Sequence, residues 1–203
     1  MVIMDKDPVE LGYKNVGKKT AMDKRDFVVF AGFLILMEGV GALMGMMTAP
    51  GGAMRPDDDW FDNLVKPSWN PPNWVFGPVW TLLYFMIALS AFKVYRKIGF
   101  SQALPWMVFF IQITLNFAWP LIFFVGHQLL GGLIDILLML VFIILNISVF
   151  IPVEKSAGLL LLPYLAWVTF ATYLNYTLWR LNPDASTSHL CYIFSDNVFL
   201  CNN

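Results

Sequence analysis

The sequence predicts an all-α integral membrane protein, a bundle of five transmembrane helices. Of its 203 residues, 58% are hydrophobic and only 13% are charged, whereas about 25% are charged in a typical soluble domain. The charges also lie between long apolar stretches, each of which is long enough to cross a bilayer. A soluble fold of this size could not cover that much apolar surface, which argues against a soluble enzyme.

The first two spans are defined by stretches that contain one charge each. Glu38 is the only charged residue between positions 27 and 54, and we expect a helix over 27–47. A loop rich in proline, glycine and aspartate follows and ends in KPSWNPP at 66–72, where three prolines oppose helix formation. The second span is expected over 73–95.

The last three spans come from two further apolar stretches. Asp135 is the only Asp, Glu, Lys or Arg over 98–153. One helix over that stretch would be about 80 Å long, against a bilayer core of about 30 Å. The segment GHQ at 126–128 divides it into a third span over 104–125 and a fourth over 129–151. The fifth span is expected over 157–181 and ends at NPD, 182–184.

Three regions follow from this division: a polar N-terminal extension (1–26), a five-helix transmembrane domain (27–182) and a C-terminal tail (183–203). All of the 13 Lys and Arg residues except Arg55, Lys66 and Arg180 fall on the N-terminal side of the membrane. Both cysteines, Cys191 and Cys201, lie in the tail, and pairing with each other, lipidation and two free thiols are all compatible with the sequence. Nothing in the charge pattern predicts nucleic-acid binding.

Polar and aromatic residues at membrane depth form stripes on three spans. They are Gln112, Asn116 and Trp119 on the third span, Tyr164, Trp167, Ala171 and Asn175 on the fifth, and Gly77, Trp80, Tyr84 and Ala88 on the second. These stripes have two interpretations, interhelical hydrogen bonding or a pocket for a large, flat, mostly apolar ligand. The acids Asp135 and Glu38 also have two interpretations. Either they interact with a ligand or a proton, or they lie near a helix end or accept hydrogen bonds from neighbouring amides.

Neither a metal site nor a bound cofactor is predicted. The two histidines, His127 and His189, fall in a turn and in the tail, so the usual axial ligands of a haem are missing at membrane depth. Trp80, Trp119 and Trp167 lie deeper than an interfacial aromatic belt. An indole stacks on conjugated rings and is easily oxidised, so such residues are suited to bind or react with a photoexcited pigment.

Three parts of the chain carry a family resemblance. They are WFDNLVKPSWNPP (60–72) with VFGPVWTLLY (75–84), LNFAWPLIFF (115–124), and LPYLAW (162–167) with FATYLN (170–175). In this order and spacing they resemble the translocator protein family, also called tryptophan-rich sensory proteins or peripheral-type benzodiazepine receptors. The match covers about residues 28–182.

The resemblance implies a five-helix bundle, often dimeric, that binds porphyrins such as protoporphyrin IX, sterols and benzodiazepine-type ligands. Some members degrade porphyrin in light, and the two tryptophans tied to that activity match Trp80 and Trp167. The family's ligand-lining positions fall on Val75, Phe76, Pro78, Leu138, Ala171 and Leu174, with Asn116 and Trp119 nearby. Its sterol-recognition stretch falls on Leu174, Tyr176 and Arg180. Gly131, Ile134 and Met46 depart from the family's pattern.

The leading hypothesis is therefore a membrane receptor or carrier for tetrapyrroles and sterol-like lipids. Lys66 would meet ligand carboxylates at the membrane edge, above a pocket formed by Trp80, Asn116, Trp119, Trp167, Ala171 and Asn175. The alternatives are light- and oxygen-dependent porphyrin degradation by Trp80 and Trp167, and a structural subunit of a larger membrane complex. We expect a homodimer in the outer mitochondrial membrane, with the endoplasmic reticulum or a bacterial membrane as alternatives.

Overall fold

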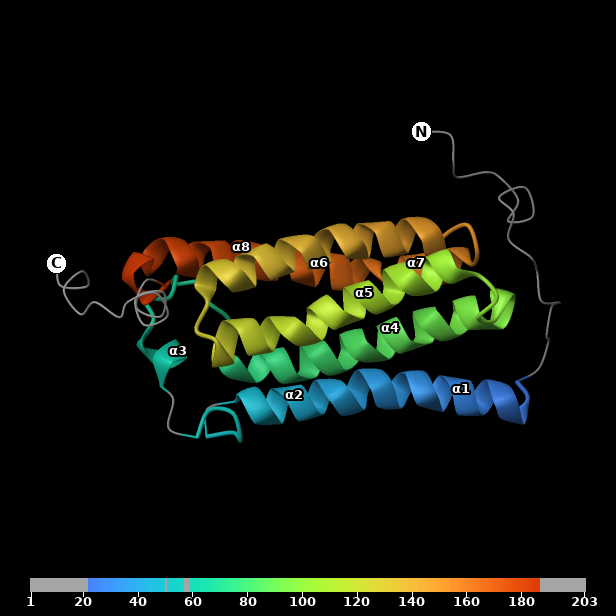
Figure 1. The fold of residues 1–203 in the computed structure, drawn as a ribbon, viewed down its shortest axis with the longest axis horizontal. Helices are drawn as coiled ribbons and strands as arrows, with labels where there is room; N and C mark the ends of the chain where they lie inside the picture. Colours follow the sequence, from blue (N-terminus) through green and yellow to red (C-terminus); the bar gives the residue numbers. More distant parts are fainter. Residues whose placement is uncertain (1–21, 50, 57–58, 187–203) are drawn as a thin grey trace, which may run out of the picture.

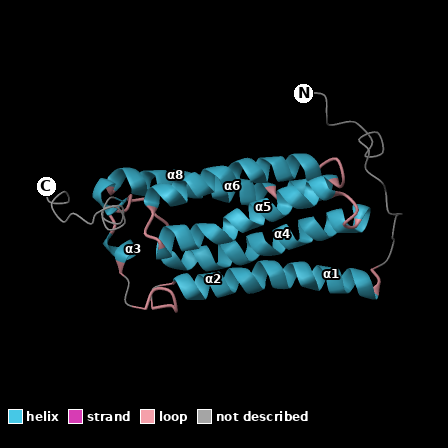
Figure 2. Cartoon of the chain, in the orientation of Figure 1, coloured by secondary structure: helices cyan, strands magenta, loops and turns pink. Residues whose placement is uncertain are grey.

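The computed structural model of the protein describes residues 22–49, 51–56 and 59–186. Within these residues five helices are long and apolar enough to cross a membrane, and they run side by side along the long axis of the molecule (Figure 1). All regular elements in the described ranges are helical (Figure 2). The prediction of an all-α bundle with five spans is thus confirmed. Cys191 and Cys201 lie outside the described residues.

The five spans are composed of ten helical segments. The first span consists of α1 (Lys24–Leu34), the π-helical η1 (Ile35–Gly39) and α2 (Val40–Thr48). After the short α3 (Trp60–Asn63), the others are η2 (Asn73–Val75) with α4 (Phe76–Ile98), α5 (Ala103–Pro120) with the π-helical η3 (Leu121–Val125), α6 (Leu129–Phe150), and α7 (Lys155–Leu160) with α8 (Leu162–Leu181). A 3-10 turn, η4 (Pro183–Ser186), follows.

The first span begins three residues before the expected position because a capping box forms at its start. The Asp23 carboxylate accepts a hydrogen bond from the backbone N–H of Asp26 (2.7 Å), and the Asp26 carboxylate accepts one from the backbone N–H of Asp23 (3.5 Å). Together these bonds satisfy two of the free N–H groups at a helix start. Asp26 is buried and also pairs with Arg96 at the end of α4 (3.6 Å).

The bundle core lies where the second to fifth spans meet. Helix α5 packs along α6, α6 along α8, and α4 against α1 and α7. The core includes Ile87, Phe109, Ile143 and Tyr164, one from each of these four spans and each fully buried. The first span is the least buried of the five.

Helix α2 approaches α4 closely at one glycine. A Cβ atom added at Gly41 would lie 2.2 Å from ring atom Cε2 of Tyr84. The Tyr84 ring cannot easily yield, because its hydroxyl donates a hydrogen bond to Asn116 Oδ1 (2.9 Å) and its face contacts Trp80. The absence of a side chain at position 41 is therefore what allows the first span to pack here.

We expect Gly41→Ala to lower the free energy of unfolding by about 1–3 kcal/mol through overpacking. Thermal unfolding of the detergent-solubilised chain measures this loss. Gly45→Ala is the matched control on the same helix, because no atom lies within 4 Å of a Cβ added there. Equal unfolding temperatures for the two variants would contradict the packing explanation.

A cluster of charges ties α4 to the turn between α6 and α7. Glu154 accepts a hydrogen bond from Ser156 Oγ (2.7 Å) and pairs with Lys97 Nζ (3.1 Å), while Lys93 Nζ donates to Ser156 Oγ (3.1 Å). Burial alone raises the pKa of Glu154, but the hydrogen bonds from Ser156 and Lys97 and the charges of Lys97 and Lys93 outweigh it. The pKa of Glu154 therefore lies below its ordinary value of 4.5.

This lowered pKa predicts a loss of stability in acid. Because the carboxyl binds its proton less readily in the folded chain, its contribution is complete above pH 4.5 and is lost as the pH falls through the lower folded pKa. We expect the unfolding temperature of the wild type to fall over that window, and Glu154→Gln to show a smaller fall. A pH profile of thermal unfolding tests this, and parallel profiles would refute the assignment.

Candidate functional site

Aromatic side chains from α4 and α8 meet inside the bundle. The ring centroids of Trp80 and Tyr84 are 5.2 Å apart, and Trp80 makes an edge contact with Tyr164 at 6.2 Å. One turn nearer the first loop, Phe76 makes an edge contact with Trp167 at 5.8 Å. We call these five residues the aromatic layer. It brings together three of the residues predicted to contact a ligand, namely Phe76, Trp80 and Trp167.

The Tyr164 hydroxyl is the centre of a buried hydrogen-bond network. It accepts hydrogen bonds from Gln112 Nε2 (2.8 Å) and Asn116 Nδ2 (2.9 Å), and it donates one to Met139 Sδ (3.3 Å). Tyr84 donates to Asn116 Oδ1, and Asn146 Nδ2 donates to Gln112 Oε1 (3.2 Å). The network joins α4, α5, α6 and α8, and it adjoins the aromatic layer through Tyr84 and Tyr164.

A second polar contact lies nearer the first loop. Trp119 Nε1 donates to Asn175 Oδ1 (3.2 Å), and Asn175 Nδ2 donates to the backbone carbonyl of Leu129 (2.9 Å). The Trp119 ring also stacks on Phe123 at 4.7 Å. The stripes on the third and fifth spans therefore face each other, and their amides hydrogen-bond between helices. The predicted ligand contacts of Asn116, Trp119 and Asn175 stay a prediction.

In α6 and α8, three buried side-chain polar atoms make no hydrogen bond within the described part of the protein. They are Asp135 Oδ2, Asn146 Oδ1 and Trp167 Nε1. Asp135 is 6% exposed, and its Oδ2 has no hydrogen-bond partner among the described residues. The neighbouring amides therefore do not hydrogen-bond to this oxygen, which was one of the two interpretations of the sequence. Buried polar atoms are normally paired, so each unpaired one needs an explanation.

The first loop is fixed over the same end of the bundle. Asn182 Oδ1 accepts from the backbone N–H of Val65 (2.8 Å), and Asn182 Nδ2 donates to the Val65 carbonyl (3.0 Å). The next residue, Lys66, is half-buried, lies 4.7 Å from the centre of the Phe61 ring and donates to the carbonyl of Asp62 (2.9 Å). Lys66 thus lies in the first loop beyond the aromatic layer, and its contact with a ligand carboxylate stays a prediction.

Two further loop contacts had no signal in the sequence. Arg55 is 2% exposed, donates to the carbonyl of Thr48 (3.1 Å) and lies 5.3 Å from the Phe124 ring centre. His127 stacks on Trp60 at 4.6 Å and has a positive φ of 53°. Both residues join distant segments, so no local pattern reveals them. Asn146 could have been found, because it is an amide in the middle of a span.

The remaining predicted residues do not all gather at one place. Val75 and Ala171 are half-buried, whereas Pro78 and Leu138 are exposed on the outside of the bundle. Leu174 is buried in a second cluster with Leu64 and Leu129. Tyr176 and Arg180 are exposed, so the three residues of the sterol-recognition stretch do not share one surface.

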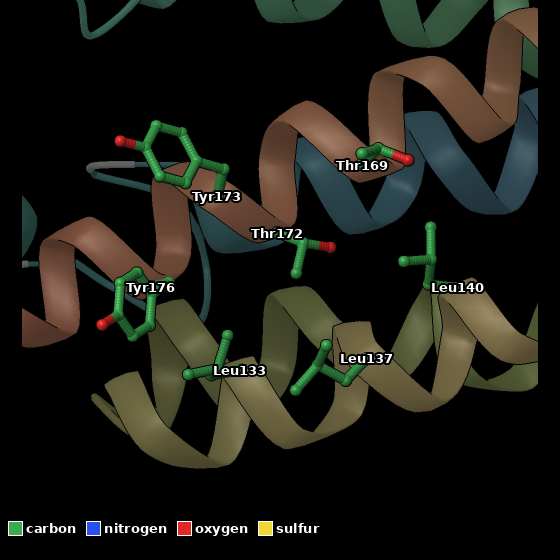
Figure 3. Close-up of a pocket in the computed structure, with 7 residues that line it drawn as sticks. All are labelled: Leu133, Leu137, Leu140, Thr169, Thr172, Tyr173 and Tyr176. Atoms are coloured by element: carbon green, nitrogen blue, oxygen red, sulfur yellow. The ribbon is translucent and has the colours of Figure 1, made fainter.

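A shallow groove opens on the outer face between α6 and α8. It has a volume of about 290 Å³ and is lined by Leu133, Leu137, Leu140, Thr169, Thr172, Tyr173 and Tyr176. Figure 3 shows the leucines facing the threonines and tyrosines across it. Thr169 and Thr172 donate to backbone carbonyls of their own helix, so the groove offers mainly apolar surface. Of the predicted residues, only Tyr176 lines it.

Comparisons with known proteins match most of this chain. Residues 33–180 match the TspO/MBR family. The tryptophan-rich protein TspO of Chlorobaculum tepidum is 44% identical over 133 residues, which cover 64% of this chain and 83% of the relative. The tryptophan-rich sensory protein of Cereibacter sphaeroides is 38% identical over 150 residues (74% and 90%), and the human translocator protein 37% over 150 residues (72% and 86%).

The family match covers most of the chain and includes the loop, the aromatic layer and the polar network. The three relatives come from two bacteria and one mammal, and each is matched over more than four fifths of its length. The fold, with five membrane spans, and the resemblance of the loop and helix motifs lead to the same assignment. The chain belongs to the TspO/MBR family.

Proposed function

We propose that this protein is a membrane receptor or carrier that binds tetrapyrroles such as protoporphyrin IX, and sterol-like lipids. The aromatic layer is the observation that carries the proposal. The Trp80 ring centre lies 5.2 Å from that of Tyr84 and 6.2 Å from that of Tyr164, and the indole N–H of Trp167 has no partner within the described residues. Aromatic side chains stack on conjugated rings, and the unpaired indole N–H is available to donate a hydrogen bond. Both properties fit a large, flat macrocycle.

The loop supplies the other half of this proposal. The carboxylates of a tetrapyrrole would lie at the membrane edge, near Lys66. There the Lys66 ammonium lies over the Phe61 ring, and Asn182 hydrogen-bonds to the backbone of the preceding residue, Val65. A charge-assisted hydrogen bond from the lysine would orient the ring with its carboxylates outward. A sterol-like lipid would instead use the outer groove, where Tyr176 provides a hydroxyl beside an apolar wall.

A titration of the full-length chain with protoporphyrin IX in the dark tests the proposal. We expect saturable quenching of tryptophan fluorescence in nanodiscs that contain the protein, and only linear partitioning in empty nanodiscs. Lys66→Ala should weaken the binding of protoporphyrin IX several-fold and leave that of its dimethyl ester unchanged. Quenching that never saturates would refute a binding site inside the bundle.

A second function, porphyrin degradation, is favoured by the position of Trp80 and Trp167 in the same layer. In this reaction an indole would donate an electron to the photoexcited ring, and the reduced ring would pass it to dioxygen. The porphyrin would then return an electron to the oxidised indole, and the porphyrin cation would combine with the superoxide, so that dioxygen oxidises the ring and the tryptophan is restored. Bleaching of bound porphyrin in light, dependent on oxygen and lost in Trp80→Phe with Trp167→Phe, would support it. Bleaching of equal rate in the double variant would identify incidental photochemistry.

We further propose a homodimer in the outer mitochondrial membrane, in keeping with the mixed-charge composition of residues 1–26. Fractionation of cells that express the chain distinguishes this membrane from the endoplasmic reticulum. Size analysis in detergent distinguishes a dimer from a monomer or a larger assembly.

A further inference from the structure

Basic side chains concentrate at the end of the bundle where α4 ends and α7 begins, on the right of Figure 1. Lys93 and Lys97 belong to the last two turns of α4, and Lys155 is the first residue of α7. Among the described residues, Glu154 is the only carboxylate that pairs with any of these three lysines. We call the three lysines, Glu154 and Ser156 the basic cluster. Three ammonium groups against one carboxylate leave two positive charges in excess.

The lysines of the basic cluster keep most of their hydrogen-bonding capacity. Each ammonium group has three N–H donors. Lys97 uses one on Glu154 Oε2 (3.1 Å), and Lys93 uses one on Ser156 Oγ (3.1 Å), which itself donates to Glu154 Oε1 (2.7 Å). Lys155 is exposed and makes no hydrogen bond or ion pair within the described part of the chain. The cluster therefore holds two ammonium groups in place and leaves donors on all three for an anion.

An apolar strip continues from the basic cluster along the outside of the fifth span. Leu159 and Leu162 follow Lys155 at four and seven residues, a spacing that places all three on one helix face. The single residue Leu161 joins α7 to α8 and has helical dihedral angles, so the face continues across the join. Leu159 is 47% and Leu162 45% exposed. In a bilayer such leucines contact acyl chains, and a lysine at the helix end reaches the headgroups.

We propose that the basic cluster binds the headgroup phosphate of an anionic phospholipid, whose acyl chain lies along Leu159 and Leu162. The excess positive charge favours an anionic headgroup over a zwitterionic one, because the latter carries its own cation beside the phosphate. The apolar strip favours a lipid over free phosphate, which gains nothing from apolar surface. Basic pockets between membrane helices bind lipid headgroups in this way. The site lies at the opposite end of the bundle from α3 and the first loop, so it is separate from the proposed tetrapyrrole site (Figure 1).

The test compares two lipids that differ in the headgroup. The full chain is kept in an uncharged detergent, and dioleoylphosphatidylglycerol or dioleoylphosphatidylcholine is titrated in while the unfolding temperature is measured. A ligand that binds only the folded chain raises this temperature. We expect phosphatidylglycerol to raise it with saturation and phosphatidylcholine to raise it much less. Inorganic phosphate at the same concentration should leave it unchanged.

Two double variants distinguish the basic cluster from a general effect of surface charge. Lys93→Gln with Lys155→Gln removes two charges of the cluster and should bind phosphatidylglycerol about 30-fold more weakly, which corresponds to about 2 kcal/mol. Lys24→Gln with Arg25→Gln is the matched control, because it removes two exposed charges of α1 at the same end of the bundle. The control should stay within a few-fold of the wild type. Lys155→Gln alone breaks no described contact, so it should fold and weaken binding about five-fold.

Three outcomes would overturn the inference. Equal losses in the two double variants would identify a diffuse effect of surface charge, with no site at the basic cluster. Equal stabilisation of the wild type by both lipids would show that the headgroup charge is not recognised. Stabilisation by inorganic phosphate as large as that by phosphatidylglycerol would identify an anion site that does not require a lipid. Each of these results leaves the proposed tetrapyrrole site standing, since that site is tested at the other end of the bundle.

Discussion

Replacing Tyr164 with phenylalanine is expected to lower the free energy of unfolding by about 2–4 kcal/mol. The change removes one oxygen and leaves the donor Gln112 Nε2 without its partner, while Asn116 Nδ2 and Met139 Sδ each lose a hydrogen bond and keep only their longer contact with each other (3.7 Å). An interhelical hydrogen bond in a membrane protein contributes about 0.6 kcal/mol on average. A buried donor left unpaired costs about 1–3 kcal/mol more. The unpaired donor therefore dominates the loss.

Thermal unfolding of the detergent-solubilised chain measures the Tyr164→Phe effect. Tyr95→Phe is the matched control. It also removes the hydroxyl of a buried tyrosine, but this residue lies on α4 and outside the network. We expect the control to unfold close to the wild type. If Tyr164→Phe also unfolded at the wild-type temperature, the network would not be what joins α5, α6 and α8.

The double variant Trp80→Phe, Trp167→Phe is expected to bind protoporphyrin IX about 10- to 100-fold more weakly in the dark. Aromatic contacts contribute about 0.5–1.5 kcal/mol each beyond the area they bury. Trp167→Phe also removes an indole N–H. This N–H has no partner within the described part of the protein and is therefore available to a ligand. Together these losses amount to about 1.5–3 kcal/mol of binding free energy. Because about 1.4 kcal/mol corresponds to a ten-fold change in affinity, the expected loss is about 10- to 100-fold.

Porphyrin absorbance is the appropriate readout, because the variant alters tryptophan fluorescence itself. The control is Trp74→Phe with Trp106→Phe, which also removes two indoles, but at positions outside the aromatic layer. Trp74 is 74% exposed, and Trp106 donates to the Gly99 carbonyl (2.9 Å) at the opposite end of the bundle. Equal losses of affinity in the two double variants would show that the aromatic layer is not where the ring binds.

The five spans could be predicted because the membrane requires long stretches with few charges, and most charges of this chain lie outside such stretches or at their ends. The spacing of Gln112 and Asn116 likewise predicted a shared face, since residues four apart lie on one side of a helix. Their partners could not be predicted. Tyr164 and Asn146 belong to other spans, and only packing decides which of the facing residues come within hydrogen-bond distance.

The two π-helical turns show a second limit of the sequence. At η3, Gly126 N–H bonds to the carbonyl of Leu121 (2.8 Å), five residues back, just after Pro120. The proline marks an irregularity, but it does not say which hydrogen-bond spacing follows. Helical periodicity could also have separated Leu174 from Tyr176, because residues two apart lie on different sides of a helix.

The most direct measurement is an experimental structure of the full chain bound to protoporphyrin IX in a lipid nanodisc. The account predicts the macrocycle between α4 and α8, in contact with Trp80 and Trp167, with its carboxylates toward Lys66. A macrocycle in the outer groove beside Leu137 and Tyr173, or one bound to the surface of the first span, would contradict it.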